Sequence, residues 1–241
     1  MNVNVSQEAA LWRDLPSRPA AVQVKRVGHI ALSTDDISQR DLADFLSDTD
    51  VALVSTRVIP SGPFPLSFCD MGDAVREATK TLAPGMPLDA VIFGCTSCSL
   101  ALGSDVIRGW IEKERPGVPV LNPMTSLMAE LKARQIRAVG IITPYSSPQN
   151  DLFEPMLSKA GIRVTGGVAI DRSNGTYLQP SRDVYEEAIQ NLMARGSPAA
   201  IVISCASLRM ANILPALNER FSIPVMTSNQ AVAASILRLK T

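Results

Sequence analysis

The sequence has a single histidine, His29, in 241 residues, and it lacks several motifs that identify common enzyme classes. A catalytic triad that needs histidine could use only His29, which lies inside an apolar run and is more typical of a satisfied core residue. The patterns G-x-S-x-G, G-K-S/T and G-x-G-x-x-G do not occur. These absences argue against serine hydrolases, P-loop proteins and dinucleotide-binding enzymes.

Charge is sparse and balanced. Lys plus Arg and Asp plus Glu both number 23, and no block of like charge is long enough for a basic track, so we expect neither nucleic acid nor a membrane as a partner. No apolar run approaches the roughly 20 residues of a membrane span, and the N-terminus lacks the apolar stretch of a signal peptide. We therefore expect a cytoplasmic protein with reduced thiols at its four cysteines, Cys69, Cys95, Cys98 and Cys205.

What the sequence does have is a regular alternation of short β-branched runs with longer segments of helical periodicity, which predicts an α/β fold with parallel sheets. The predicted strands are 27–32, 51–56, 89–94, 138–143, 162–167 and 199–204. The predicted helices lie near 37–47, 71–82, 99–114, 124–134, 149–160, 181–195, 208–219 and 228–239.

Two parts of the chain are similar to each other. AVIFGCTSCSLAL and AIVISCASLRMAN each end a strand in a cysteine, and a short Val-Pro-Val or Ile-Pro-Val strand and another helix follow in both. The repeat predicts two similar lobes of domain size. We expect a loosely held N-terminal arm at 1–24, a first lobe at 25–135, a second at 136–227, and a C-terminal segment, 228–241, that packs back on the first lobe.

Cys95 and Cys205 occupy equivalent positions in the repeat, at the carboxyl ends of parallel strands, where ligands bind. Backbone N–H groups there stabilise a thiolate. If the lobes face each other, the two sulfurs border one cleft, and Cys69 lies outside it. Such a pair can remove a proton from one face of a carbon and return one to the other without a metal or cofactor.

Other interpretations of the cysteines stay open. A single cysteine at a strand end is more often a packing residue, although its repetition favours function. Cys95 and Cys98 form a C-x-x-C pair that could be redox-active or bind zinc, but no second metal pair and no preceding aromatic residue support this. We expect Cys98 and Cys69 to be packing residues, and for Cys98 a position in the cleft is the alternative.

Polar loops follow the first strand of each lobe, LSTDD at 32–36 and TPYSSPQND at 143–151. Their hydroxyl and N–H groups suit a carboxylate. Ser33, Thr34 and Asp35 could equally cap the next helix. Tyr145 stands at a strand end, which favours a role in binding.

GCTS at 94–97, TPY at 143–145, Asn174 after a strand and SCAS at 204–207 together resemble the aspartate/glutamate racemase superfamily, in particular its maleate isomerase and arylmalonate decarboxylase group. Within that group the chain is most similar to the maleate-isomerase-like proteins named for ectoine utilisation. The likeness covers almost all of residues 25–240.

The resemblance implies two pseudo-symmetric Rossmann-like lobes with parallel four-stranded sheets and an active site at their interface. It implies no cofactor, a small carboxylate substrate, and leaves a homo-oligomer open. Cys95 would be the nucleophile or base, Cys205 the acid on the opposite face, and Tyr145 and Asn174 ligands of substrate carboxylates. The other expected substrate-binding residues are Ser33, Thr34, Asp35, Thr96, Ser97, Ala206 and Ser207.

Two features bear on the reaction. Decarboxylases of this group keep only the second cysteine, so the presence of both favours an isomerase or racemase. Maleate isomerases carry Asn where this chain has Asp35, whose charge would repel a dianion, so a substrate with an amine or amide is favoured. The alternatives are a decarboxylase, a non-catalytic protein that binds a small acid, and a thiol redox protein.

Overall fold

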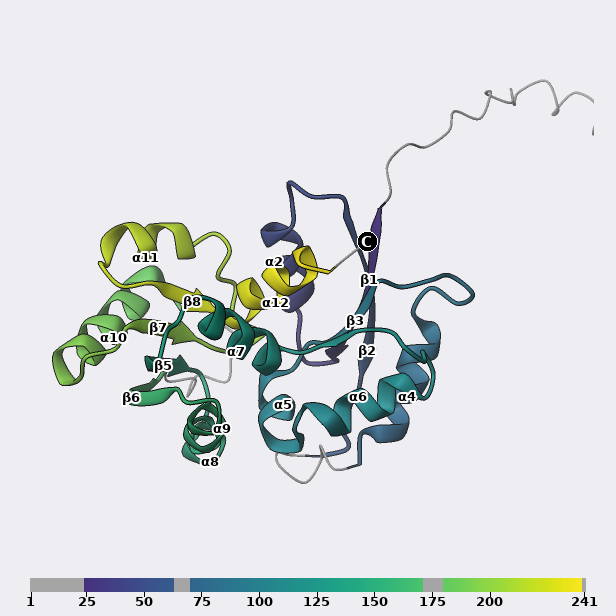
Figure 1. Ribbon diagram of the computed structural model, residues 1–241, viewed down its shortest axis with the longest axis horizontal. Helices are drawn as coiled ribbons and strands as arrows, with labels where there is room; N and C mark the ends of the chain where they lie inside the picture. The colour runs from purple at the N-terminus through teal and green to yellow at the C-terminus, as the bar shows by residue number, and fades with distance from the viewer. Residues whose placement is uncertain (1–23, 63–69, 171–179, 240–241) are drawn as a thin grey trace, which may run out of the picture.

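The computed structural model describes residues 24–62, 70–170 and 180–239, and it contains two four-stranded parallel sheets (Figure 1). The first sheet has the order β2-β1-β3-β4 and consists of β1 (Lys25–Leu32), β2 (Val51–Val58), β3 (Ala90–Phe93) and β4 (Val120–Leu121). The second has the order β6-β5-β7-β8 and consists of β5 (Ala138–Thr143), β6 (Arg163–Ala169), β7 (Ala200–Ile203) and β8 (Val225–Thr227). The identical order confirms the predicted pair of similar α/β halves.

The helices connect these strands and cover the sheets. They are α2 (Ser38–Phe45), α4 (Gly72–Thr81), α5 (Thr96–Leu102), α6 (Ser104–Glu112), α7 (Pro123–Ala133), α8 (Ser147–Asn150), α9 (Phe153–Lys159), α10 (Arg182–Arg195), α11 (Leu214–Arg220) and α12 (Ser228–Leu237). Among the described residues, none of these helices has the length and apolar character needed to cross a membrane.

Three predicted helices differ from the structure. The prediction of one helix over 99–114 is wrong, because Gly103 adopts φ 78°, which glycine tolerates best, and separates α5 from α6. The predicted 149–160 helix is two short helices, α8 and α9. The predicted 208–219 helix begins only at Leu214, since the N–H groups of Met210 and Ala211 are bonded to a side chain of the other lobe.

The central strands β3 and β7 are buried along their whole length. Because both faces of such a strand are covered, its sequence is a continuous run of apolar residues. Each is third in its sheet, and each is followed by two residues that end in a cysteine, Gly94-Cys95 and Ser204-Cys205. The two thiols therefore occupy equivalent points of the two halves, and the fold places both at the carboxyl edge of a sheet.

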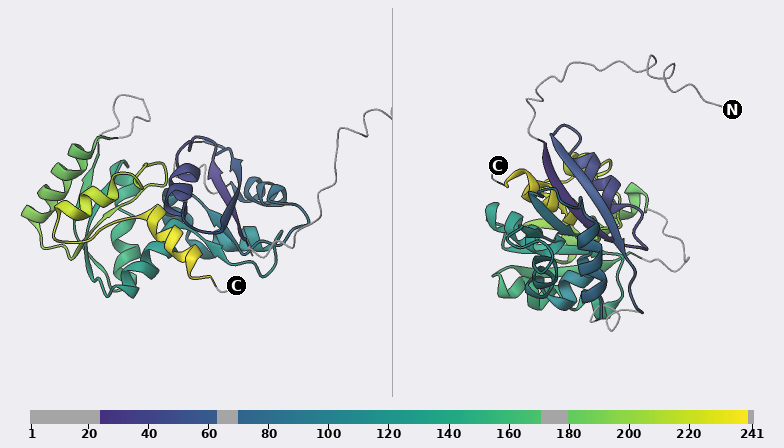
Figure 2. Two further views of the ribbon diagram at one scale, coloured as in Figure 1. Left: turned by 90° about the horizontal axis from the view of Figure 1, so that it is seen from above. Right: turned by 90° about the vertical axis from the view of Figure 1, so that its right-hand side faces the viewer.

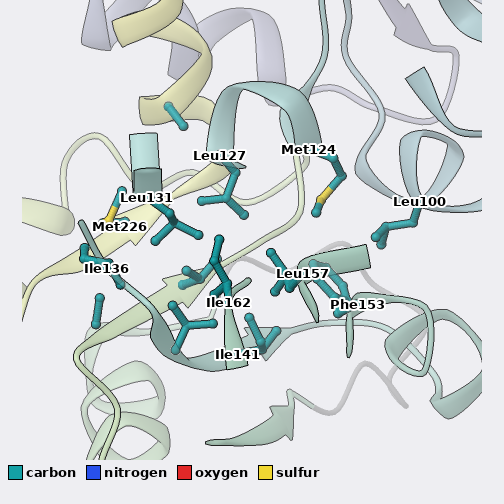
Figure 3. Close-up of a cluster of buried hydrophobic side chains, with 14 residues drawn as sticks. Leu100, Met124, Leu127, Leu131, Ile136, Ile141, Phe153, Leu157, Ile162 and Met226 are labelled. Carbon is teal, nitrogen blue, oxygen red and sulfur yellow. The ribbon is translucent and has the colours of Figure 1, made fainter. Parts of the chain in front are cut away.

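The two halves exchange helices where they meet. Side chains of α7, including Leu127, point into the core of the second sheet toward Ile141 and Ile162 (Figure 3). Conversely, Val232 and Ile236 of α12 pack with β1 and β3 of the first sheet. Helices α7 and α12 also contact each other at the junction of the lobes (Figures 1 and 2). This exchange fixes how the two carboxyl edges face each other.

Candidate active site

A cavity of about 190 Å³ lies where the carboxyl ends of the four central strands, β1, β3, β5 and β7, come together. Its lining residues are Leu32, Thr34, Asp35, Gly94, Cys95, Thr96, Ser97, Pro144, Tyr145, Gln149, Cys205, Ala206 and Ser207. The structure thus brings Cys95 and Cys205 to one cavity between the lobes. A larger hollow of about 350 Å³ at α7 has neither a thiol nor a carboxylate in its wall. It therefore lacks the reactive groups of an active site despite its larger volume.

Cys95 stands at the start of α5, and the residue is only 7% exposed. Its sulfur accepts a hydrogen bond from the backbone N–H of Cys98 at 3.5 Å and lies 3.4 Å from the Ser97 hydroxyl. These contacts hold the pKa of Cys95 below its ordinary value, the side chain of Cys98 contributing most, whereas burial and the charge of Asp35 act in the opposite direction. These contacts favour the thiolate form of Cys95.

Gly94 allows the Cys95 turn to pass directly over His29. A Cβ at Gly94 would lie 2.5 Å from His29 Nε2, closer than real side chains approach. The buried imidazole is 3.3 Å from the Ser38 hydroxyl and 3.4 Å from that of Ser55. His29 is absent from the cavity wall and supports the turn from beneath, in agreement with its interpretation as a core residue.

The buried His29 should make stability fall in mild acid. Burial lowers the pKa of His29 from 6.5 to about 4, so the unfolded chain binds more protons between these values and stability is lost as the pH falls through this window. We expect a loss of about 3 kcal/mol between pH 7 and pH 4 from this group. Urea unfolding at several pH values, with His29→Asn as reference, measures it. If the free energy of unfolding changes with pH to the same extent in the wild type and in His29→Asn, His29 is not the group responsible.

The loop that carries Cys205 is held from the other lobe. Asp41 of α2 is fully buried, and its Oδ1 accepts hydrogen bonds from the N–H groups of Met210 at 2.7 Å and Ala211 at 2.8 Å. Its Oδ2 accepts from Asn229 Nδ2 at 2.8 Å, and the same amide group donates to the carbonyl of Ala206 at 2.9 Å. Burial raises the pKa of Asp41, and the hydrogen bonds oppose this. Asp41 and Asn229 therefore fix the backbone beside Cys205.

Tyr145 brings its phenol hydroxyl to Cys205 and Thr96. Burial is the main reason that its pKa lies well above the ordinary value, followed by the charges of Cys205 and Cys95 and a hydrogen bond with Cys205, while a hydrogen bond with Thr96 opposes the rise. The hydroxyl consequently stays protonated near neutrality and can donate a hydrogen bond. Tyr145 also packs against both cores of the second lobe, which fixes its ring.

Asp35 has a different environment for each carboxylate oxygen. Oδ1 accepts from the N–H groups of Ile37 at 3.0 Å and Ser38 at 2.9 Å, so it caps the start of α2, the structural role that the sequence left open. Oδ2 is buried and has no hydrogen-bond partner within the described part of the chain. Because Asp35 also lines the cavity, capping does not exhaust its role.

The remaining predicted residues divide into three groups. Those that line the cavity are Thr34, Thr96, Ser97, Ala206 and Ser207. Ser33 is exposed and does not line it, and its N–H donates to the carbonyl of Val58. Asn174 and Cys69 lie outside the described residues.

Cys98 and Gln149 complete the neighbourhood. Cys98 is fully buried, its sulfur lies 4.0 Å from that of Met71, and burial raises its pKa far above the ordinary value, so it stays a thiol. Its side chain also hydrogen-bonds to Cys95, so its role goes beyond the packing that the sequence predicted. Gln149 lines the cavity and accepts from the hydroxyl of Ser146 at 2.7 Å. Sequence reasoning missed Gln149 as a site residue, although it lies in the TPYSSPQND loop, four residues after Tyr145. Within the described ranges, no group of three or more His, Cys, Asp or Glu could hold a metal ion.

Fold and cavity together define a class of two-lobed α/β protein in which cysteines after equivalent strands border one interlobe cavity. Residues 65–241 match the arylmalonate decarboxylase family, and the chain belongs to this family. The resemblance inferred from the GCTS and SCAS motifs is thereby confirmed at the level of the family.

Three relatives illustrate the similarity. The arylmalonate decarboxylase of Bordetella bronchiseptica is 26% identical over 133 residues, a match that spans 53% of this chain and 54% of the relative, about half of each. A Nocardia farcinica maleate cis-trans isomerase mutant with a covalently bound succinylcysteine intermediate superposes with a TM-score of 0.77, 17% identity, and coverage of 90% of this chain and 92% of the other. The maleate isomerase Iso of Pseudomonas putida S16 superposes with a TM-score of 0.73 and 17% identity, and the match covers 89% of this chain and 92% of the other.

Proposed function

We propose that the protein is a cofactor-independent isomerase or racemase of a small carboxylic acid, and that Cys95 and Cys205 are its catalytic residues. The observation that carries the proposal is that these two thiols, from equivalent strand ends, line the same cavity of about 190 Å³. The names of the structural neighbours, maleate isomerase and arylmalonate decarboxylase, denote reactions of small diacids and support this class of substrate. A link to ectoine utilisation stays a prediction.

In a racemisation, the Cys95 thiolate removes the proton from the carbon next to the substrate carboxylate. The electron pair of the broken C–H bond moves toward that carboxylate, where the Tyr145 hydroxyl can donate a hydrogen bond to the developing charge. Cys205 gives its proton to the opposite face of the carbon and becomes the thiolate. The enzyme then holds a thiol at Cys95 and a thiolate at Cys205, which is the arrangement that starts the reverse reaction.

In a cis-trans isomerisation the same pair works differently. The Cys95 sulfur adds to one alkene carbon while the other carbon takes a proton, which leaves a single bond that can rotate. Loss of that sulfur and of a proton restores the double bond in the other geometry. The relative that carries a succinylcysteine supports a covalent intermediate of this kind.

A second candidate is decarboxylation of a malonate-type diacid, which the family match and the curated relative support. Replacement of CO₂ by a proton needs one acid only, so the second thiol favours the first candidate. The polar wall also offers few apolar side chains for an aryl group, chiefly Leu32, Pro144 and Tyr145. Burial raises the pKa of Cys98 far above its ordinary value, which weighs against Cys98 as the attacking thiolate of a redox pair with Cys95.

Proton NMR in D₂O distinguishes these candidates. The protein is incubated with small mono- and dicarboxylic acids, with and without an α-amino group, including maleate, aspartate and phenylmalonate. We expect cis-trans conversion, or exchange of the hydrogen next to a carboxylate, with retention of every carboxylate. Loss of CO₂ from phenylmalonate as the only reaction would favour the second candidate, and an unchanged set of acids would contradict both.

A further inference from the structure

The carboxylate of Asp35 is held at the cavity with one oxygen unsatisfied. The residue is 3% exposed, and both backbone donors at the start of α2 bond to Oδ1, so Oδ2 keeps no partner among the described residues. A buried carboxylate oxygen without a donor is unfavourable, and native structures rarely retain one without a reason.

No positively charged side chain of the described cavity wall donates a hydrogen bond to Oδ2 of Asp35. Among the described lining residues there is no lysine, arginine or histidine, and Asp35 is the one carboxylate. Arg57, the nearby cation, donates to the backbone carbonyls of Asp35 and Leu32 instead of to the carboxylate. Oδ2 therefore has no charged donor among the described residues of the cavity wall, in which Asp35 is the one carboxylate.

We propose that Asp35 is the specificity-determining residue of this site and that the substrate is a small carboxylate with a protonated nitrogen near the reacting carbon, bound by Asp35 Oδ2. An ammonium group supplies both the donor and the positive charge that the wall lacks. Neutral hydroxyl groups of Thr34 and Tyr145 also line the cavity and can donate to the substrate carboxylate. A plain dianion would bring like charge against Asp35. This inference rests on the proposed function and names its substrate class.

The same contact links binding to activation of the thiol. The pKa of Cys95 lies below its ordinary value as a whole, and the charge of Asp35 is a smaller contribution in the opposite direction. A ligand cation on Oδ2 offsets that charge and favours the thiolate when an amine-bearing substrate is present.

The test uses two thiol reagents of similar shape and opposite charge, 2-aminoethyl and 2-sulfonatoethyl methanethiosulfonate. In each reaction the cysteine thiolate attacks the sulfenyl sulfur, a disulfide forms, and methanesulfinate leaves. Peptide mass spectrometry gives the rates at Cys95 and Cys205 separately, and the ratio of the cationic to the anionic reagent is the quantity compared. Asp35→Asn should lower this ratio about tenfold at Cys95, because it removes the charge while asparagine remains an equally good helix cap.

The matched control is Asp36→Asn, which removes the same charge from the next, exposed position, outside the cavity wall. Its ratio should stay within about twofold of the wild type because an exposed charge is screened. An unchanged ratio in Asp35→Asn, an equal fall in both variants, or a lack of cationic labelling at both cysteines would overturn the inference. The proposed function is tested separately: it fails if Cys95→Ser and Cys205→Ser retain catalysis. That result would not change the labelling ratios of the wild type, Asp35→Asn and Asp36→Asn.

Discussion

Replacing Cys95 or Cys205 by serine should each reduce turnover by about a thousandfold while the protein stays folded. Serine fits either position, but its hydroxyl has a far higher pKa than a thiol and is a poor base or nucleophile near neutrality. The effect should be similar for the two variants, since a reaction that uses opposite faces of one carbon needs both groups. The measurement is kcat for any acid that the wild type converts, with circular dichroism as the check on folding.

The matched control for this experiment is Cys69→Ser, which should keep activity because the repeat gives that cysteine no equivalent. If the reaction proceeds by addition to an alkene, Cys205→Ser should also accumulate a ligand adduct on Cys95, visible in the intact mass. Wild-type rates from both active-site variants would remove the thiol pair from the mechanism.

Asp41→Ala should lower the free energy of unfolding by about 3 kcal/mol and also alter the site. The change leaves the N–H groups of Met210 and Ala211 and the amide of Asn229 without their buried acceptor. Because that acceptor holds the loop after β7, the reactivity of Cys205 toward iodoacetamide should change relative to that of Cys95. Urea unfolding and site-resolved labelling measure the two effects.

Asp41→Asn is the conservative comparison. Its side-chain oxygen can still accept from the two backbone N–H groups, so it should lose less stability than Asp41→Ala and keep Cys205 closer to its native reactivity. If both variants lose stability but the ratio of Cys205 to Cys95 labelling stays constant, Asp41 is a structural residue only and does not position the thiol.

The central strands and the position of the thiols can be predicted from sequence because they depend on local patterns. β3 and β7 are short apolar runs followed closely by cysteine, and their repetition alone assigns Cys95 and Cys205 to equivalent points of two lobes. Helix ends are harder to predict. The break at Gly103 depends on one backbone conformation, and the late start of α11 depends on a partner in another lobe.

The parts that escaped prediction depend on distant contacts. Asp41 and Asn229 are 188 residues apart in sequence, and no local pattern indicates that their side chains meet. Asp41 does fall beside Leu42 on the buried stripe of α2, and a carboxylate on such a stripe is a signal that the sequence contains. For Asp35 the sequence offered capping or binding as alternatives, whereas the structure gives capping to one oxygen and leaves the other without a hydrogen-bond partner among the described residues.

The central claim, that Cys95 and Cys205 face each other across one cavity, is tested most directly by cross-linking the native protein with 1,3-dichloroacetone. Two thiolates displace the two chlorides and become joined by a short bridge, which peptide mass spectrometry locates. We predict a bridge between Cys95 and Cys205, accompanied by loss of catalysis and absent from Cys95→Ser. A bridge from Cys95 to Cys98, or separate adducts on Cys95 and Cys205 with no bridge, would contradict the account.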